Sequence, residues 1–172
     1  RRMTNSLPMK VIKIKFPNKT TFARCLVDDD NYEEMKKVKW HLIKDGYAAN
    51  VKYLFRRDGK DVMQTNLMHR LILNAPDYKA SSLQVDHVNG DKLDNRKKNL
   101  RFCTNSENKM NQMKHKDNSL GVKGVSRNKK RFAARVQANK KGYYLGTYDS
   151  IDEASRAYKA KAKELHREFF HP

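Results

Sequence analysis

Three residues stand out by their chemistry, namely the adjacent pair Asp86 and His87 and the later Asn108. A carboxylate and an amide carbonyl are the oxygen ligands that hard cations such as Mg²⁺ prefer. An imidazole, with its ordinary pKa of ~6.5, is suited to take a proton from a water that attacks phosphorus. The cation would stabilise the phosphate and the leaving 3′-oxygen. This combination predicts metal-assisted phosphodiester hydrolysis, although an Asp-His pair beside an Asn-Gly turn is also ordinary loop chemistry.

The elements that must position these residues are predicted to be two strands and a helix. Residues 85–88 and 99–103 are short apolar strand segments separated by an Asn-Gly turn and a polar loop. A Thr-x-x-Glu capping box at 104–107 predicts a helix to about residue 113. A helix that packs back over the strands brings Asn108 opposite the strand that carries Asp86. The local order is therefore strand, loop, strand, helix.

The flanking segments also carry clear patterns. The N-terminal part predicts a hairpin from residues 11–16 and 20–27, a short helix at 30–38 capped by Asp30, a second hairpin around an Asp-Gly turn, and helical spacing at 67–72. The C-terminal part predicts three strands followed by an amphipathic helix that begins at a Ser-x-x-Glu capping box. The three strand segments are 124–127, 132–138 and 143–147.

The charge of the chain points to a polyanionic partner. The 172 residues hold 38 Lys and Arg against 19 Asp and Glu, a net charge of +19. Residues 114–149 alone balance at +8, which favours nucleic acid over general solubility or weak adhesion to an anionic membrane. No apolar run approaches the ~20 residues of a membrane span. Two cysteines cannot build a disulfide framework or a Cys-rich zinc site, and a reducing cytosol suits them.

The spacing of the chemical residues resembles the HNH endonuclease motif. The resemblance covers residues 66–113 and rests on VDHVNGDKLDNRKKNLR at 85–101 and NSEN at 105–108. It implies a ββα-metal fold in which His87 is the general base, Asp86 a metal ligand, and Asn99 a residue that orients His87 and braces the loop. Asn108 stands where many members have a final His, which implies Mg²⁺ or Mn²⁺ as the metal. Cleavage would leave 5′-phosphate and 3′-hydroxyl ends.

Basic residues beside the motif are expected to contact DNA. The dipeptide His69-Arg70 resembles the segment that precedes the motif in phage and intron-encoded members, which implies that Arg70 touches the scissile phosphate. A helix-surface pair is the alternative. The loop residues Arg96, Lys97 and Lys98 are expected near the DNA backbone, with an ordinary solvated loop as the alternative.

The C-terminal segment, about 119–170, resembles the ethylene-response-factor (apetala-type) DNA-binding domain of plants. GVSR, RFAARV, YYLGTY and EASRAY carry the resemblance. It implies a three-stranded sheet in the major groove, backed by one helix. Strand alternation predicts that five residues share the outward face, with Tyr144 at a position where plant members have Trp; a charged, solvated sheet is the alternative. These five residues are Arg127, Lys129, Arg131, Arg135 and Tyr144.

The sequence thus predicts an α+β protein with a ββα-metal nuclease core. Four segments are expected: an N-terminal α+β scaffold (1–65), the core (66–114), a linker (115–121), and a three-stranded antiparallel sheet packed on one helix (122–172). The predicted function is a metal-dependent HNH endodeoxyribonuclease, a homing or nicking enzyme of phage or intron type. The expected partner is double-stranded DNA, without a membrane or a small-molecule cofactor, and the chain would act as monomer or homodimer in the host cytosol. A DNA-binding regulator with an inactive core and a ribosomal-type RNA-binding protein are the competing interpretations.

Overall fold

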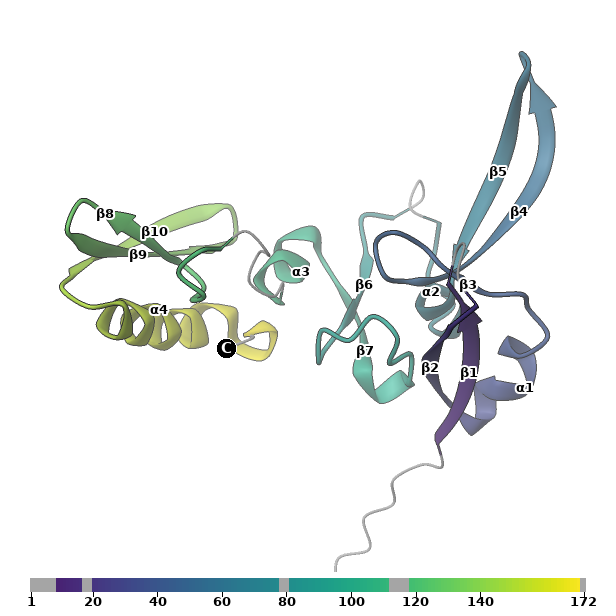
Figure 1. Cartoon of the computed structure of the whole chain (residues 1–172), viewed down its shortest axis with the longest axis horizontal. Coiled ribbons are helices and arrows are strands. Elements are labelled where there is room, and N and C mark those ends of the chain that lie inside the picture. The colour runs from purple at the N-terminus through teal and green to yellow at the C-terminus, as the bar shows by residue number, and fades with distance from the viewer. Residues whose placement is uncertain (1–8, 17–19, 78–80, 112–117, 171–172) are drawn as a thin grey trace, which may run out of the picture. The chain divides into compact units, whose positions relative to one another are not determined.

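The computed structural model describes residues 9–16, 20–77, 81–111 and 118–170. The chain divides into two compact units, which are described separately. Unit 1 comprises Arg1–Ser81 and His87–Phe102, and unit 2 comprises Ser82–Asp86 and Cys103–Pro172. Helices and several sheets occur together (Figure 1), so the expected mixed α+β class is confirmed. In the part of the chain that is described, no helix is both long and apolar enough to cross a bilayer.

Unit 1 is built on a five-stranded sheet in the order β2-β1-β3-β4-β5. Its short central strand β3 pairs in parallel with β1 and antiparallel with β4, which joins two hairpins into one sheet. In β1, Ile12 and Ile14 are buried while their neighbours are exposed, as alternation along a half-buried strand requires. The elements are β1 (Met9–Lys15), β2 (Phe22–Asp28), α1 (Asp29–Met35), β3 (His41–Leu42), β4 (Ala48–Arg57), β5 (Lys60–Leu67) and α2 (Met68–Ile72).

Two features of unit 1 differ from the sequence expectation. Strand β5 was not predicted. It pairs with β4 in a long hairpin that extends from the sheet in Figure 1, and most of both strands is exposed, so the hairpin lacks the alternation that marks a strand. Helix α1 begins at Asp29, after the N-cap residue Asp28, so the predicted cap at Asp30 is wrong. The turn predicted at residues 17–19 lies outside the described residues.

The motif region contains two short strands and a helix. Strands β6 (Gln84–His87) and β7 (Leu100–Cys103) form a two-stranded sheet, with the short 3-10 helix η1 (Lys97–Asn99) before β7 and helix α3 (Asn105–Asn111) after it. The predicted capping box is confirmed. The Thr104 backbone N–H donates to the Glu107 carboxylate at 2.7 Å, and the Glu107 N–H donates to Thr104 Oγ1 at 3.3 Å. Residues 112 and 113 of the predicted helix lie outside the described residues.

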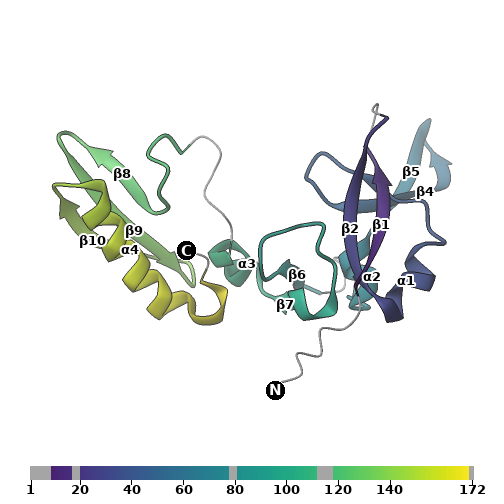
Figure 2. The same ribbon diagram turned by 60° about the horizontal axis from the view of Figure 1, so that its bottom comes forward.

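The larger part of unit 2 is an antiparallel sheet in the order β10-β9-β8 with helix α4 along one face (Figure 2). Ala154, Tyr158 and Ala162 form the buried stripe of α4. Gly124 precedes β8 with φ +71°, and a Cβ there would lie 2.0 Å from the Tyr158 ring, so only glycine fits. The elements are β8 (Val125–Asn128), β9 (Arg131–Ala138), β10 (Lys141–Tyr148), α4 (Ile151–His166) and the 3-10 helix η2 (Arg167–Phe169).

Helix α3 is packed against this sheet within unit 2. Cys103 and Met110 form a buried cluster with Ala138 of β9 and Phe169 of η2. Lys123 Nζ donates to the Met110 carbonyl at 3.1 Å, close to the last turn of α3, where a cation is favourable. The α3 helix of the motif and the C-terminal sheet are therefore parts of one packed body. Residues 115–117 of the predicted linker lie outside the described residues.

Candidate active site

His87 is buried at the end of β6, with 3% of its surface exposed. Its Nε2 lies 3.0 Å from Oδ1 of Asn95. An amide oxygen only accepts hydrogen bonds, so Nε2 carries the proton and Nδ1 is the basic nitrogen of the neutral ring. This tautomer follows from the orientation of the amide, whose Nδ2 faces Cys25 Sγ at 2.8 Å. The contact with Asn95 thus fixes the orientation of the imidazole and the tautomer of its neutral form.

The outer edge of β2 holds Asn95 in this position. The Asn95 backbone N–H donates to the Leu26 carbonyl at 2.9 Å, and the Leu26 N–H donates to the Leu93 carbonyl at 2.8 Å. Burial raises the pKa of the Cys25 thiol to about 12, so the thiol stays protonated and donates to Met68 Sδ. Asn95 is thereby fixed through both its backbone and its side chain. Sequence reasoning missed this residue, because its contacts to β2 are far apart in the chain.

Two aromatic rings border the His87 imidazole. The ring of His69, in α2, lies 4.9 Å from it between centroids in an edge-on arrangement, and the Tyr47 ring lies 6.0 Å from it. Burial, assisted by the nearby His87 and Arg70, lowers the pKa of His69 to about 3. His69 is therefore neutral at physiological pH. Sequence reasoning noted His69 only as part of a dipeptide and did not identify Tyr47, which follows the glycine of a hairpin turn with no further signal.

Asn99 closes the loop between β6 and η1. Its Nδ2 donates to Asn89 Oδ1 at 2.9 Å and to the Asp94 carbonyl at 2.8 Å, and its Oδ1 accepts from the Asn89 backbone N–H at 3.0 Å. These bonds join the two ends of the loop. The expected residue for orienting His87 was Asn99, but the amide that contacts the His87 ring belongs to Asn95. Asn99 instead braces the loop from which Asn95 extends.

The basic residues expected at the DNA fall into two groups. The Arg96 guanidinium forms a bidentate salt bridge with the Asp94 carboxylate, with both N–O distances 2.6 Å. This salt bridge lowers the pKa of Asp94. Arg70 is 7% exposed and donates to the Pro76 carbonyl. Both arginines thus hold local structure. In contrast, Lys97 and Lys98 are exposed in η1, where ammonium groups can reach a phosphate.

The expected metal ligands belong to unit 2, where α3 faces β6. Asn111 Nδ2 donates to Asp86 Oδ1 at 2.9 Å, and Asn108 Nδ2 donates to Gln84 Oε1. Gln84 and Asp86 share a face of the strand, and Asn108 and Asn111, three residues apart, share a face of the helix. The two hydrogen bonds therefore join the same pair of facing surfaces. Asp86 and Asn108 therefore come from facing surfaces of β6 and α3.

The chemistry of the two expected ligands, one carboxylate and one amide, suits a hard divalent cation. The amide nitrogen of Asn108 is used in the bond to Gln84, so Oδ1 would be the atom that it offers to a metal. Among the described residues no group of three or more His, Cys, Asp or Glu side chains is placed to hold a metal ion. Oxygen donors in so small a number are typical of Mg²⁺, which keeps several waters and binds substrate phosphates.

The C-terminal sheet presents a basic face, with one correction to the expectation. In β9, Arg131 and Arg135 alternate with the residues that pack under α4, and Arg135 pairs with Tyr144, its guanidinium carbon 5.6 Å from that ring centroid. Arg127 pairs with Phe132 and contacts its ring at 5.4 Å, so it lies on the other face of the sheet. The prediction of one shared face overlooked that Arg127 has the same parity as the core residue Val125. Lys129 lies in the β8–β9 turn with φ +54°.

The chain is similar in sequence to known HNH endonucleases. The HNH endonuclease family model (HNH_3) matches residues 77–110. An uncharacterized HNH endonuclease of Acanthamoeba polyphaga mimivirus is 32% identical over 156 residues, which cover 90% of this chain and 75% of the viral protein. Protein 3.8 of Escherichia phage T7 is 31% identical over 87 residues, 49% of this chain and 71% of that protein. No solved structure matches the chain significantly. Because the match to this viral relative covers 90% of the chain and 75% of the relative, the chain belongs to the HNH endonuclease family.

Proposed function

We propose that the protein is a metal-dependent DNA endonuclease that hydrolyses phosphodiester bonds with His87 as the general base. The observation that carries the proposal is the buried imidazole whose Nε2 is held by Asn95, which makes Nδ1 its basic nitrogen. Family membership supports the same activity and does not favour a regulator with an inactive core.

In the proposed reaction His87 removes a proton from the water that attacks the scissile phosphorus. Asp86 and Asn108 are the proposed ligands of a Mg²⁺ or Mn²⁺ ion, which when bound would stabilise charge on the phosphate and on the leaving 3′-oxygen. Asp86 and His87 are consecutive residues of β6, and alternation turns their side chains to opposite faces of a regular strand, so the proposed joint action of the two requires a bend or twist of the strand there. In this proposal Asn95 orients the base, and Asn99 holds the loop that carries Asn95. The products would be 5′-phosphate and 3′-hydroxyl ends.

The proposed DNA anchor is the C-terminal sheet, which we interpret as an apetala-type module. Arg131, Arg135 and Tyr144 share its exposed face, and Lys129 lies in the adjoining turn. Guanidinium groups on a sheet face can contact phosphates or guanine edges. Packing of Met110 against Ala138 supports a module attached firmly to α3. Lys97 and Lys98 are proposed as further phosphate contacts near the base.

The proposed biological setting is that of a phage or intron-associated nicking or homing enzyme in the host cytosol. Relatives in a phage and in a virus of Acanthamoeba support this setting. Both cysteines are buried and neither forms a disulfide, which is compatible with a reducing compartment. One general base per chain makes nicking natural for a monomer, and a homodimer could cut both strands.

Incubation of supercoiled plasmid with the protein tests the proposal. Mg²⁺ or Mn²⁺ should convert the plasmid to open-circle or linear form, and EDTA should prevent the conversion. An Asp86→Asn variant is the matched test of the metal ligand. It removes one charge with little change in shape, and it should need a higher Mg²⁺ concentration for the same rate. Cleavage that is equally fast in EDTA would contradict a metal-dependent mechanism.

A further inference from the structure

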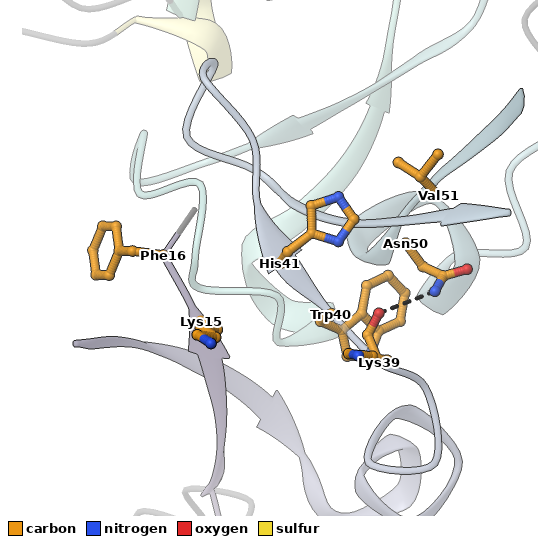
Figure 3. A pocket seen from close by; sticks show the side chains of 7 residues that line it. All are labelled: Lys15, Phe16, Lys39, Trp40, His41, Asn50 and Val51. Carbon is orange, nitrogen blue, oxygen red and sulfur yellow. Dashed lines mark hydrogen bonds between the residues drawn. The ribbon is translucent and has the colours of Figure 1, made fainter. Parts of the chain in front are cut away.

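Unit 1 contains a pocket that shares no residue with the candidate active site. It is a pocket of about 310 Å³ near the junction of β1, β3 and β4, where Lys15 pairs with His41 and His41 pairs with Ala49. In Figure 3 the His41 ring lies between Phe16 on one side and Trp40 and Asn50 on the other. The lining residues are Lys15, Phe16, Lys39, Trp40, His41, Asn50 and Val51.

The floor and one wall of this pocket are held in place by the protein itself. Trp40 is 5% exposed, and its indole N–H donates to the Met35 carbonyl at 2.7 Å. Asn50 Nδ2 donates to the Lys39 carbonyl at 3.0 Å, the bond drawn in Figure 3. A ligand would therefore meet a preformed surface, and little conformational freedom would be lost on binding.

The composition of the lining favours a ligand that combines a flat ring system with a negative charge. Three of the seven side chains carry aromatic rings, two carry ammonium groups, one carries an amide, and none carries a carboxylate. Lys15 and Lys39 are both exposed at the pocket. A nucleotide has the matching chemistry, because its base stacks on aromatic rings and its phosphate pairs with lysine. A volume at the lower end of ligand pockets, which span ~300–1,000 Å³, suits one nucleotide and no more.

We propose that this pocket binds the base and phosphate of a single unpaired nucleotide, with the base beside His41 and Trp40 and the phosphate at Lys15 and Lys39. A base inside a duplex is stacked and paired, so only an unpaired, extruded or terminal nucleotide can enter. The assignment of that nucleotide to a DNA strand rests on the proposed nuclease function. Occupancy of the pocket itself requires neither a metal ion nor His87.

Trp40 makes the proposal directly testable, because it is the only tryptophan in the chain and it lines the pocket. Its fluorescence, excited at the red edge where nucleotides do not absorb, is followed in EDTA during titration with 2′-deoxyadenosine 5′-monophosphate. Saturable quenching is expected. Deoxyribose 5-phosphate and inorganic phosphate, which lack a base, should quench little. Absence of saturable quenching by the nucleotide, or equal quenching by deoxyribose phosphate, would overturn the proposal.

Matched variants locate the binding within the unit. His41→Ala and Lys39→Glu should each weaken nucleotide binding about tenfold, the order expected for one stacking or one phosphate contact. Lys37→Glu makes the same charge change at an exposed lysine outside the lining, and it should change affinity less than about twofold. Equal weakening by Lys37→Glu and Lys39→Glu would show general attraction to positive charge and would overturn the site.

A final comparison identifies the source of the nucleotide. A short oligodeoxythymidylate is expected to quench Trp40 more strongly than a duplex of equal length or the matching oligouridylate. Quenching by the duplex to the same extent would overturn the requirement for an unpaired base, and stronger quenching by the oligouridylate would overturn the assignment to DNA. Because these titrations contain no metal ion and measure no cleavage, their failure is distinguishable from failure of the proposed nuclease function.

Discussion

Replacement of Asn95 by Ala tests whether this buried amide orients the general base. Asn95 is 1% exposed and cannot reach DNA, yet its Oδ1 holds His87 Nε2 at 3.0 Å. Without it the imidazole can turn away from the productive orientation. We expect the single-turnover rate of cleavage to fall about 10- to 100-fold, the range found when a residue that orients a functional histidine is removed. Affinity for duplex DNA should change less than about twofold.

The same substitution should lower the free energy of unfolding. The amide bonds to His87 and to Cys25 each contribute about 1 kcal/mol net, and the imidazole N–H left buried without its partner adds about 1–3 kcal/mol. The expected total is about 3–5 kcal/mol, measured by urea unfolding. Cys25→Ala is the matched control, because it removes the contact on the far side of Asn95, together with the thiol bond to Met68, and leaves the contact between Asn95 and His87 in place. This control should be destabilised by about 1–2 kcal/mol and should cleave DNA within about threefold of the wild type.

Asn95→Asp distinguishes an orienting role from a merely structural one. A carboxylate keeps an oxygen beside His87 Nε2 and favours the protonated imidazole. The acid limb of the pH–rate profile should therefore move to higher pH, while part of the lost rate returns. If folded Asn95→Ala cleaves at the wild-type rate, or if Asn95→Asp leaves the pH profile unchanged, Asn95 does not orient the base.

Two further predictions concern acid stability and DNA affinity. Burial lowers the pKa of His69 from 6.5 to about 3. Below pH 6.5 the imidazole is therefore protonated in the unfolded chain but remains neutral in the folded chain. The stabilisation present above pH 6.5 is consequently lost as the pH falls toward 3. In urea unfolding from pH 6.5 to 4.5, His69→Gln should lose up to about 1.4 kcal/mol less per pH unit than the wild type, and parallel curves would refute this. Arg135→Glu should weaken duplex binding about tenfold and reduce the salt slope by about one, whereas Lys159→Glu on α4 should do neither; equal effects in filter-binding titrations would count against the sheet face.

Local patterns allowed much of the secondary structure to be predicted. The three C-terminal strand segments lie within about two residues of β8, β9 and β10, and the Ser150 cap was placed correctly, with the Glu153 N–H donating to its hydroxyl. Turn chemistry and alternation are local properties, which explains this agreement. Strand β5 escaped prediction because its hairpin is exposed on both faces and its burial pattern has no period.

The surroundings of the candidate base were the part that sequence could not supply. The motif spacing drew attention to His87 and Asn99, but Asn95 reaches His87 only because β2 binds the backbone of the loop through Leu26. Contacts between residues so far apart leave no periodic signal. Arg127 is a different case, because alternation within β8 already places it on the same face as the core residue Val125.

The central claim is that His87 is the base of a metal-dependent DNA cleavage reaction. Its most direct test compares wild-type protein and His87→Ala on supercoiled plasmid in Mg²⁺, with duplex binding measured on the same samples. Loss of nicking with duplex affinity retained is the predicted result. A folded His87→Ala protein that nicks the plasmid as fast as the wild type would contradict the account.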